Sequence, residues 1–278
     1  MFGERKLVIA TKHEKERVIA PILESELGVI CFVPDNFDSD AFGTFSGEVE
    51  RKLDPVETAK RKCRLAMELN SCDLGVASEG SFGPHPSNFF ASADDEILVF
   101  IDTANDLEII ARELTIETNF DGRAVANMSE LLEFAEAAKF PSHGLILRPA
   151  KGVNEQIIKS IIDRAELEAG YTKLFETYGS AYVETDMRAM FNPTRLKVIG
   201  DAAVKLAARV KSLCPKCATH GFGVVEMRPG LRCSMCGAPT DSALSLVSRC
   251  KRCGFEADEM YPNGNTLEDP RFCGICNP

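Results

Sequence analysis

Eight of the eleven cysteines stand in the last quarter of the chain, where they form four C-x-x-C pairs. Two thiolates separated by two residues can bind one metal ion from a single tight turn, and four thiolates complete the tetrahedral coordination that Zn²⁺ prefers. The gaps between the pairs, 15, 13 and 19 residues, are typical of four-cysteine zinc ribbons. The sequence therefore predicts two zinc sites. Their ligands are Cys214, Cys217, Cys233, Cys236, Cys250, Cys253, Cys273 and Cys276.

The four pairs can combine in two ways. We expect the sequential arrangement, in which the first pair joins the second and the third joins the fourth; an interleaved arrangement, first with third and second with fourth, stays open. Because all eight ligands are thiolates, no coordination position is left for a reacting water, and the zinc is expected to be structural. Gly237 and Gly254 directly follow two of the pairs and suit the turns that these need. His220 is expected to be a loop residue rather than a ligand.

Polar side chains follow three apolar runs in the first 210 residues, namely 7–10, 74–77 and 97–101. In open α/β sheets, ligands bind beyond the carboxyl ends of strands. Carboxylates from two strand ends can hold Mg²⁺, while lysines and hydroxyls contact phosphates. We therefore predict a nucleotide-phosphate site in which Glu79 and Asp102 are catalytic. The substrate-binding residues of this predicted site are Thr11, Lys12, Lys15, Ser78, Gly80 and Ser81.

Three of these segments carry a family resemblance. The run 10–13 (Ala-Thr-Lys-His) before a helix, the run 57–59 (Glu-Thr-Ala) at a helix start, and the run 75–80 (Gly-Val-Ala-Ser-Glu-Gly) are similar to motifs of the inosine/xanthosine triphosphate pyrophosphatases. The resemblance spans residues 6–150. It implies an elongated mixed α/β fold and Mg²⁺-dependent hydrolysis of noncanonical nucleoside triphosphates to monophosphate and pyrophosphate. It also implies that Thr11, Lys12 and Lys15 contact phosphates and that Glu79 is a metal or base carboxylate.

The whole chain also resembles a bacterial family of uncharacterised activity that carries the same tail of four C-x-x-C pairs, each of which we call a knuckle. Strands and helices are expected to alternate through the first 210 residues, as a mixed sheet flanked by helices in a three-layer α/β domain. We expect this domain to span residues 1–210 and the zinc ribbon to span 211–278. A helix is predicted to start at Asp54 and Pro55, another to span 154–168, and residues 34–47 to form a loop. For residues 184–195 we favour a salt-bridge latch of Asp186 with Arg188 or Arg195 over a phosphate clamp.

The charge balance, 32 Lys and Arg against 42 Asp and Glu, gives a net charge of −10. Seven basic and seven acidic residues cancel within 212–278, so the first 211 residues carry the whole excess. Such a chain is expected to bind neither nucleic acid non-specifically nor anionic membranes. No apolar run is long enough to span a membrane and no signal peptide is evident, so we expect a cytoplasmic protein. The alternative to a hydrolase is a non-enzymatic adaptor whose zinc tail binds a protein or RNA.

Overall fold

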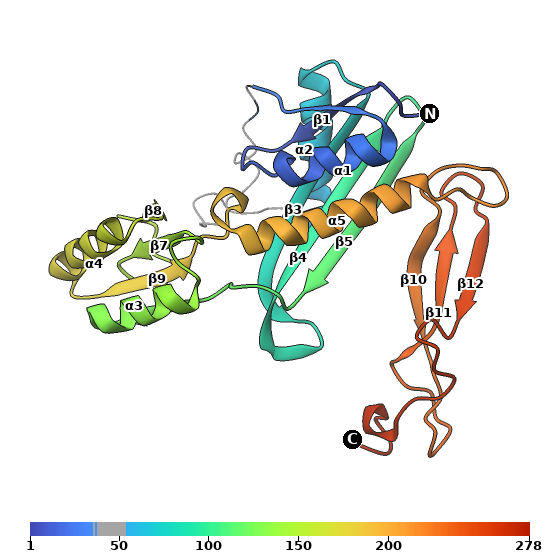
Figure 1. Cartoon of the computed structure of the whole chain (residues 1–278). Coiled ribbons are helices and arrows are strands. Elements are labelled where there is room, and N and C mark those ends of the chain that lie inside the picture. Colours follow the sequence, from blue (N-terminus) through green and yellow to red (C-terminus); the bar gives the residue numbers. More distant parts are fainter. Residues whose placement is uncertain (36, 38–53) are drawn as a thin grey trace. The chain divides into compact units, whose positions relative to one another are not determined.

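The computed structural model describes residues 1–35, 37 and 54–278. The chain divides into two compact units, Met1–Ala207 (unit 1) and Ala208–Pro278 (unit 2) (Figure 1). Unit 1 is a mixed α/β structure, and unit 2 is a small ribbon with two four-cysteine groups. The predicted fold class is thereby confirmed. Most of the loop predicted over 34–47 lies outside the described residues.

The larger sheet of unit 1 has the strand order β2-β1-β3-β4-β5. β1 pairs in parallel with β2 and β3, whereas β3, β4 and β5 form an antiparallel meander. β1 is short and almost wholly buried, and β3 and β4 extend well beyond its end as a long hairpin. The strands are β1 (Lys6–Ala10), β2 (Ile30–Phe32), β3 (Leu74–His85), β4 (Asn88–Asp102) and β5 (Leu107–Thr115).

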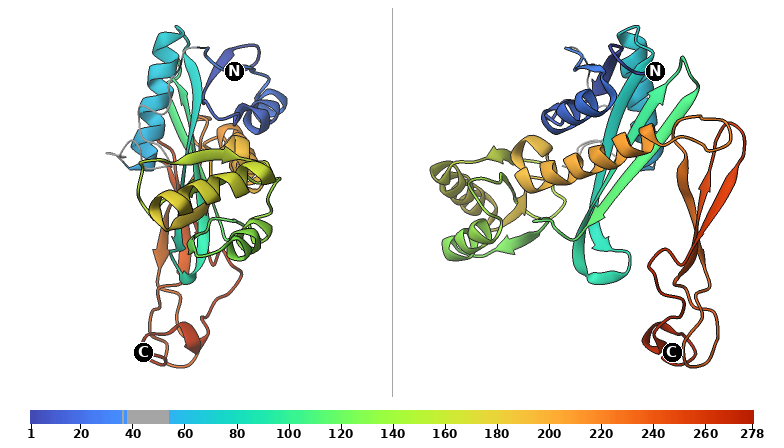
Figure 2. Two further views of the ribbon diagram at one scale, coloured as in Figure 1. Left: turned by 90° about the vertical axis from the view of Figure 1, so that its left-hand side faces the viewer. Right: turned by 45° about the vertical axis from the view of Figure 1, so that its right-hand side comes forward.

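Helices cover both faces of this sheet (Figure 2). On one face lies α2 (Pro55–Leu69), which begins where the sequence predicts because the Asp54 carboxylate accepts hydrogen bonds from two backbone amides of the first turn. Cys63 of α2 is fully buried against the sheet. A Cβ on Gly75 of β3 would lie 2.9 Å from the Cys63 Sγ, so glycine allows this close packing. On the other face lie α1 (Glu16–Leu27) and α5 (Pro193–Lys211).

A second, smaller sheet in unit 1 has the order β6-β9-β7-β8 and a hydrophobic core of its own. The sequence predicted one mixed sheet, and the structure has two. The helix predicted over 154–168 is wrong: this segment contains β8, and α4 starts only after Asp163, whose carboxylate accepts from the Ala165 and Glu166 amides. The elements are β6 (Gly122–Val125), α3 (Met128–Ala137), β7 (Leu145–Arg148), β8 (Ile158–Ile161), α4 (Arg164–Tyr178), β9 (Ala181–Thr185) and the 3-10 turn η2 (Ala189–Phe191).

Unit 2 is built on an antiparallel meander of three strands. Val210, Leu231 and Val247 are its fully buried aliphatic side chains among the described residues. So small a core leaves the four buried cysteines as the main interior groups of the unit. The elements are β10 (Gly223–Pro229), β11 (Ala243–Arg249), β12 (Glu256–Met260) and the 3-10 turn η3 (Pro270–Phe272). Within the described residues of the whole chain, no helix has the length and apolarity that crossing a membrane requires.

Candidate functional site

The eight cysteines of unit 2 gather into two groups of four, and the pairing is interleaved. The sequential pairing expected from the sequence is therefore wrong. The reason is the meander: β10 leads from the first knuckle to the second, β11 returns to the third, and β12 runs back towards the fourth. Knuckles one and three thus meet at one end of the ribbon. The groups are Cys214, Cys217, Cys250 and Cys253, and Cys233, Cys236, Cys273 and Cys276.

The sulfur atoms of each group are spaced as ligands of one metal ion. Cys214 and Cys253 lie 3.7 Å apart between their Sγ atoms, and Cys217 and Cys250 lie 3.6 Å apart. In the second group the corresponding distances are 3.8 and 3.6 Å. Tetrahedral coordination with Zn–S bonds of about 2.3 Å places sulfur atoms about 3.8 Å apart. The geometry of both groups therefore fits a tetrahedral zinc ion.

Each knuckle is closed by the same backbone hydrogen bond, in which the residue after the second cysteine donates to the carbonyl of the first. The Gly237 amide donates to Cys233 at 2.9 Å and the Gly254 amide to Cys250 at 3.0 Å. Both glycines have φ near +70°, as the sequence led us to expect. His220 is not a member of either group; its Nδ1 lies 2.8 Å from the Val210 carbonyl oxygen.

Unit 1 contains a cluster of charged and polar side chains that is almost completely shielded from solvent. It lies where β3 and β4 continue past the end of β1. We call it the buried charged cluster, and its members are Lys15, Lys62, Ser78, Glu79, Asp94, Glu96 and Arg195. Burial of this many ionisable groups is costly unless they are paired, and such groups concentrate at functional sites.

Lys15 connects the segment that follows β1 with the polar part of β3. Its Nζ donates to the Ser78 hydroxyl at 2.8 Å, so the segment after β1 and the polar part of β3 meet as the sequence led us to expect. Burial and the nearby Arg195 guanidinium lower the pKa of Lys15 to about 8, although Glu96 and Glu79 act in the opposite direction. A lysine with such a pKa is still mainly protonated at neutral pH, so its ammonium group can offset the charge of a bound anion.

The two faces of the sheet divide the carboxylates of the cluster. Glu79 lies opposite Ile97 on the α2 face and forms an ion pair with Lys62 of α2. Glu96 lies opposite Gly80 on the other face, where its Oε1 accepts from the Arg195 Nε of α5 at 2.6 Å. A Cβ on Gly80 would collide with both side chains of this pair, so glycine makes their approach possible.

Asp94 lies two residues before Glu96 on the same strand, and both side chains are fully buried. Neither Asp94 carboxylate oxygen has a hydrogen-bond partner in the described part of the structure, and the same is true of the Glu96 Oε2. Burial, together with the charge of Glu96, raises the pKa of Asp94 to about 8. The cluster therefore contains carboxylate oxygens that no protein group satisfies within the part of the chain that the structure describes.

Asp102 is not part of this cluster, and the predicted partnership of Glu79 and Asp102 at one metal ion is corrected. Because β4 is antiparallel to β3, its carboxyl end lies beside Leu74 at the beginning of β3, several residues from Glu79. There the Asp102 carboxylate accepts from both terminal nitrogens of Arg5, at 2.6 and 2.8 Å. Burial alone would raise the pKa of Asp102, but the hydrogen bonds from Arg5 and Asn105 hold it below its usual value.

The other predicted substrate-binding residues occupy different positions. Thr11 is buried directly after β1, while Lys12 is exposed and Ser81 is half-buried. Gly80 lies under the Glu96–Arg195 pair. Of the predicted substrate-binding residues, Lys15 and Ser78 therefore belong to the buried charged cluster. The others, Thr11, Lys12, Gly80 and Ser81, lie outside it.

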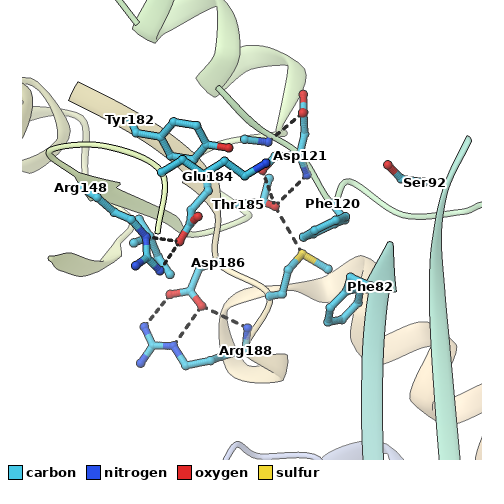
Figure 3. Close-up of a pocket in the computed structure, with 14 residues that line it drawn as sticks. Phe82, Ser92, Phe120, Asp121, Arg148, Tyr182, Glu184, Thr185, Asp186 and Arg188 are labelled. Carbon is cyan, nitrogen blue, oxygen red and sulfur yellow. Dashed lines mark hydrogen bonds and ion pairs between the residues drawn. The ribbon is translucent and has the colours of Figure 1, made fainter. Parts of the chain in front are cut away.

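A pocket of about 320 Å³ lies in unit 1 between the two sheets (Figure 3). The Phe82 and Phe120 rings stack on its wall with their centroids 5.5 Å apart. The Arg195 guanidinium lies 5.1 Å from the centre of the Phe82 ring, so Phe82 connects the pocket with the buried charged cluster. From the smaller sheet, Arg148 and Glu184 contribute an ion pair in which Arg148 Nε donates to Glu184 Oε1 at 2.8 Å.

The acidic and basic residues before α5 form only part of the predicted latch. Asp186 is fully buried at the edge of the pocket and accepts from the Arg188 Nε at 3.0 Å (Figure 3). The Arg188 guanidinium also lies 4.7 Å from the centre of the Phe191 ring. Arg195 pairs with Glu96 instead, and its Nη1 donates to the Met187 carbonyl. The segment thereby links α5 to β4.

His143 is a structural residue of unit 1. Its Nε2 accepts from the Thr194 amide in the first turn of α5 at 3.3 Å, and the Ser142 hydroxyl lies 3.0 Å from its Nδ1. Burial and then the nearby Lys139 charge lower the pKa of His143. The neutral imidazole therefore acts as a capping group for α5.

Sequence reasoning missed Lys62, Asp94, Glu96 and Arg195 as members of the cluster. A signal was present in the run Asp94-Asp95-Glu96 before the apolar run 97–101. Since alternate residues of a strand share a face, Asp94 and Glu96 fall on the face that also carries Leu98 and Phe100, which are buried. Two carboxylates in phase with a buried strand face are a sign of a polar interior site.

In the comparison with known families, residues 62–278 fit the model of DUF6671, described as a domain of unknown function. The match covers the cysteine ribbon and most of unit 1. No curated protein matches the chain. The resemblance to inosine/xanthosine triphosphate pyrophosphatases is not shown by these comparisons.

Proposed function

The chain belongs to the DUF6671 family, whose function is unknown, and we propose from its own geometry that unit 1 hydrolyses a nucleotide at its phosphates with the help of Mg²⁺. The observation that carries this proposal is the buried charged cluster, in which Lys15 at the start of α1 donates to Ser78 and also feels the charges of Glu96 and Glu79. Cations and hydroxyls fixed in a dry site stabilise phosphate charge more strongly than they would in water.

The pocket beside the cluster supports a nucleoside-bearing substrate. Its volume, about 320 Å³, lies within the range of small-molecule sites. The stacked Phe82 and Phe120 rings offer an aromatic wall to a planar base. Phe82 also contacts Arg195 of the cluster, so a ligand whose base lies in the pocket can direct its phosphates towards Lys15.

In the proposed reaction, a water oxygen forms a new bond to the α-phosphorus while the P–O bond to the β-phosphate breaks. The pyrophosphate leaving group keeps the electron pair, and the proton lost by the water passes to solvent. Lys15 and Ser78 offset the charge on the phosphate oxygens. Glu79 pairs with Lys62 on the opposite face of the sheet, so the proposal gives it no contact with the reacting phosphate. A bound Mg²⁺ would neutralise part of the phosphate charge. The proposal assigns no role to Asp102, since Arg5 binds it at the other end of β3.

The test is the release of pyrophosphate and phosphate by the full-length, zinc-loaded protein with Mg²⁺ and a panel of nucleoside triphosphates that includes the inosine and xanthosine forms. Lys15→Met should reduce turnover about 100-fold or more, as expected when one charge-stabilising group is lost. Lys60→Met is the matched control, since Lys60 is a lysine of α2 that pairs with Glu57 and Glu108 away from the cluster. A wild-type protein that is folded and turns over no member of the panel contradicts the proposal.

In unit 2, we propose that the bound metal is zinc and that its role is structural. The all-thiolate ligand sets and the sulfur–sulfur distances support this assignment. Elemental analysis of the purified protein should give two zinc ions per chain. A content of one or none, in protein prepared without chelator, would contradict it.

A second candidate function, docking of a partner protein on unit 2, is favoured by exposed apolar side chains around the second cysteine group. Met235 and Ile275 lie inside its two knuckles and are 74% and 71% exposed, and Phe272 beside it is 66% exposed. Large exposed apolar groups that adjoin one another are typical of interaction sites. Retention of a binding protein by the full-length chain, and its loss when Met235 and Ile275 are both changed to serine, would support this function.

A further inference from the structure

The strongest unexplained feature of unit 1 is the pair of carboxylates on β4. Asp94 and Glu96 are each 0% exposed. Three of their four carboxylate oxygens, both of Asp94 and the Oε2 of Glu96, have no hydrogen-bond partner among the described residues. A buried carboxylate without partners costs several kcal/mol, so such groups are normally paired or bind metal ions.

The cations of the cluster do not satisfy these oxygens. Lys15 donates to Ser78, and Lys62 pairs with Glu79 on the opposite face of the sheet. Arg195 binds the other oxygen of Glu96, its Oε1. The arrangement thus uses one oxygen of the pair and leaves the remaining three facing no donor in the described structure.

We propose that Asp94 and Glu96 form a binding site for one divalent cation of the Mg²⁺ or Mn²⁺ type. The donor set consists of carboxylate oxygens, which are hard ligands and favour these ions over zinc or copper. Within the described residues, no further His, Cys, Asp or Glu side chain joins the two carboxylates to make a group of three. Mg²⁺ is commonly held by only one or two carboxylates and keeps water or phosphate oxygens at its other positions.

The strand itself presets this site. Because Asp94 and Glu96 are two residues apart on β4, both side chains lie on the face that carries α1 and α5. Gly80 on the neighbouring strand provides the space in which Glu96 and Arg195 meet. Arg195 fixes one oxygen of Glu96, so that the other is held in a defined position.

This inference names the metal ligands of the proposed hydrolase, but it can be tested without any nucleotide. Mn²⁺ is titrated into the full-length, zinc-loaded protein, and binding is followed by the loss of the electron paramagnetic resonance signal of free Mn²⁺. We expect one Mn²⁺ per chain in the wild type, displaced by excess Mg²⁺. Asp94→Asn keeps the side-chain shape but removes a ligand charge, and should weaken Mn²⁺ binding at least about 10-fold.

Asp95→Asn is the matched control. Asp95 neighbours both proposed ligands in sequence, but its carboxylate accepts from the Arg112 Nε at 2.6 Å, outside the buried charged cluster. This variant should bind Mn²⁺ as the wild type does. Equal binding by Asp94→Asn and the wild type, or equal weakening by Asp94→Asn and Asp95→Asn, would overturn the proposal, as would a wild type that binds no Mn²⁺.

A measurement on the unmodified chain keeps the test independent of how the variants fold. Bound Mn²⁺ broadens nuclear magnetic resonance signals nearby, so the amides of 79–81 and 94–97 should be broadened first. Broadening confined to other segments would refute the assignment. Mn²⁺ binding at Asp94 and Glu96 without turnover of any nucleotide would support the metal site and contradict the proposed function. Turnover of a nucleotide without Mn²⁺ bound at Asp94 and Glu96 would support the proposed function and contradict the metal site.

Discussion

The interleaved arrangement of the cysteine pairs makes a prediction that sequential pairing does not share. If the first and third knuckles share one metal ion, removing a thiolate from either knuckle should abolish that site and leave the other site intact. Cys217→Ser and Cys253→Ser should therefore damage the same site, although 36 positions separate them in the sequence. Cys236→Ser should damage the other site.

The expected effect is large because metal binding dominates the stability of unit 2. Its three fully buried aliphatic side chains, Val210, Leu231 and Val247, contribute about 5–9 kcal/mol together. One structural zinc site contributes about 10–16 kcal/mol at neutral pH. Loss of one site should thus unfold one end of the ribbon, and removal of both metals with a chelator should unfold unit 2. Unit 1 has its own cores and should keep its secondary structure.

The assay is ¹¹³Cd nuclear magnetic resonance of the cadmium-substituted full-length protein, which should give two signals in the range of all-thiolate coordination. The double variant of Cys217 and Cys253 should keep one signal, whereas the double variant of Cys217 and Cys236 should keep none. Sequential pairing would reverse these two results, and that reversal would refute the account. Cys31→Ser is the control, since Cys31 lies in β2 of unit 1 and should leave both signals unchanged.

Three further predictions concern unit 1. Arg195→Met leaves the buried Glu96 carboxylate without its partner and should lower the free energy of unfolding by about 3–5 kcal/mol, measured by urea denaturation. Because burial lowers the pKa of His143, the folded state favours the neutral imidazole. The contribution of His143 to the free energy of unfolding should therefore be constant above about pH 6.5 and fall as the pH drops below that value. His143→Asn should remove this pH dependence. Asp102→Asn removes the ion pair with Arg5 and should lower the free energy of unfolding by about 1–3 kcal/mol while leaving nucleotide turnover unchanged. Because the pKa of Asp102 is depressed, the stabilisation by this carboxylate should be present above about pH 4 and disappear as the pH falls further. A turnover defect in Asp102→Asn would restore this residue to the site.

Local signals in the sequence predicted those parts of the fold that local chemistry decides. Asp54 before Pro55 marks a helix start because a capping carboxylate and a proline both suit the first turn, and α2 begins there. The C-x-x-C spacing identified all eight metal-ligating cysteines for the same reason, since each knuckle is a self-contained turn.

What the sequence left undetermined depends on how distant strands pair. The order of the knuckles around the metals follows from the β10–β11–β12 meander, which no spacing rule reveals. In the same way, Asp102 and Glu79 both follow apolar runs, but the antiparallel pairing of β3 and β4 sends them to opposite ends. Arg195 reaches Glu96 from a helix 99 residues further along the chain, and no local pattern links them.

Equilibrium binding shows whether the buried charged cluster binds the phosphates of a nucleotide. A nonhydrolysable nucleoside triphosphate is titrated into the full-length, zinc-loaded protein with Mg²⁺, and the heat of binding is compared between the wild type, Lys15→Met and the control Lys60→Met. We expect one binding site, whose affinity Lys15→Met lowers at least about 10-fold and Lys60→Met leaves unchanged. Binding of equal strength in all three proteins, or no binding by any nucleotide, would contradict it.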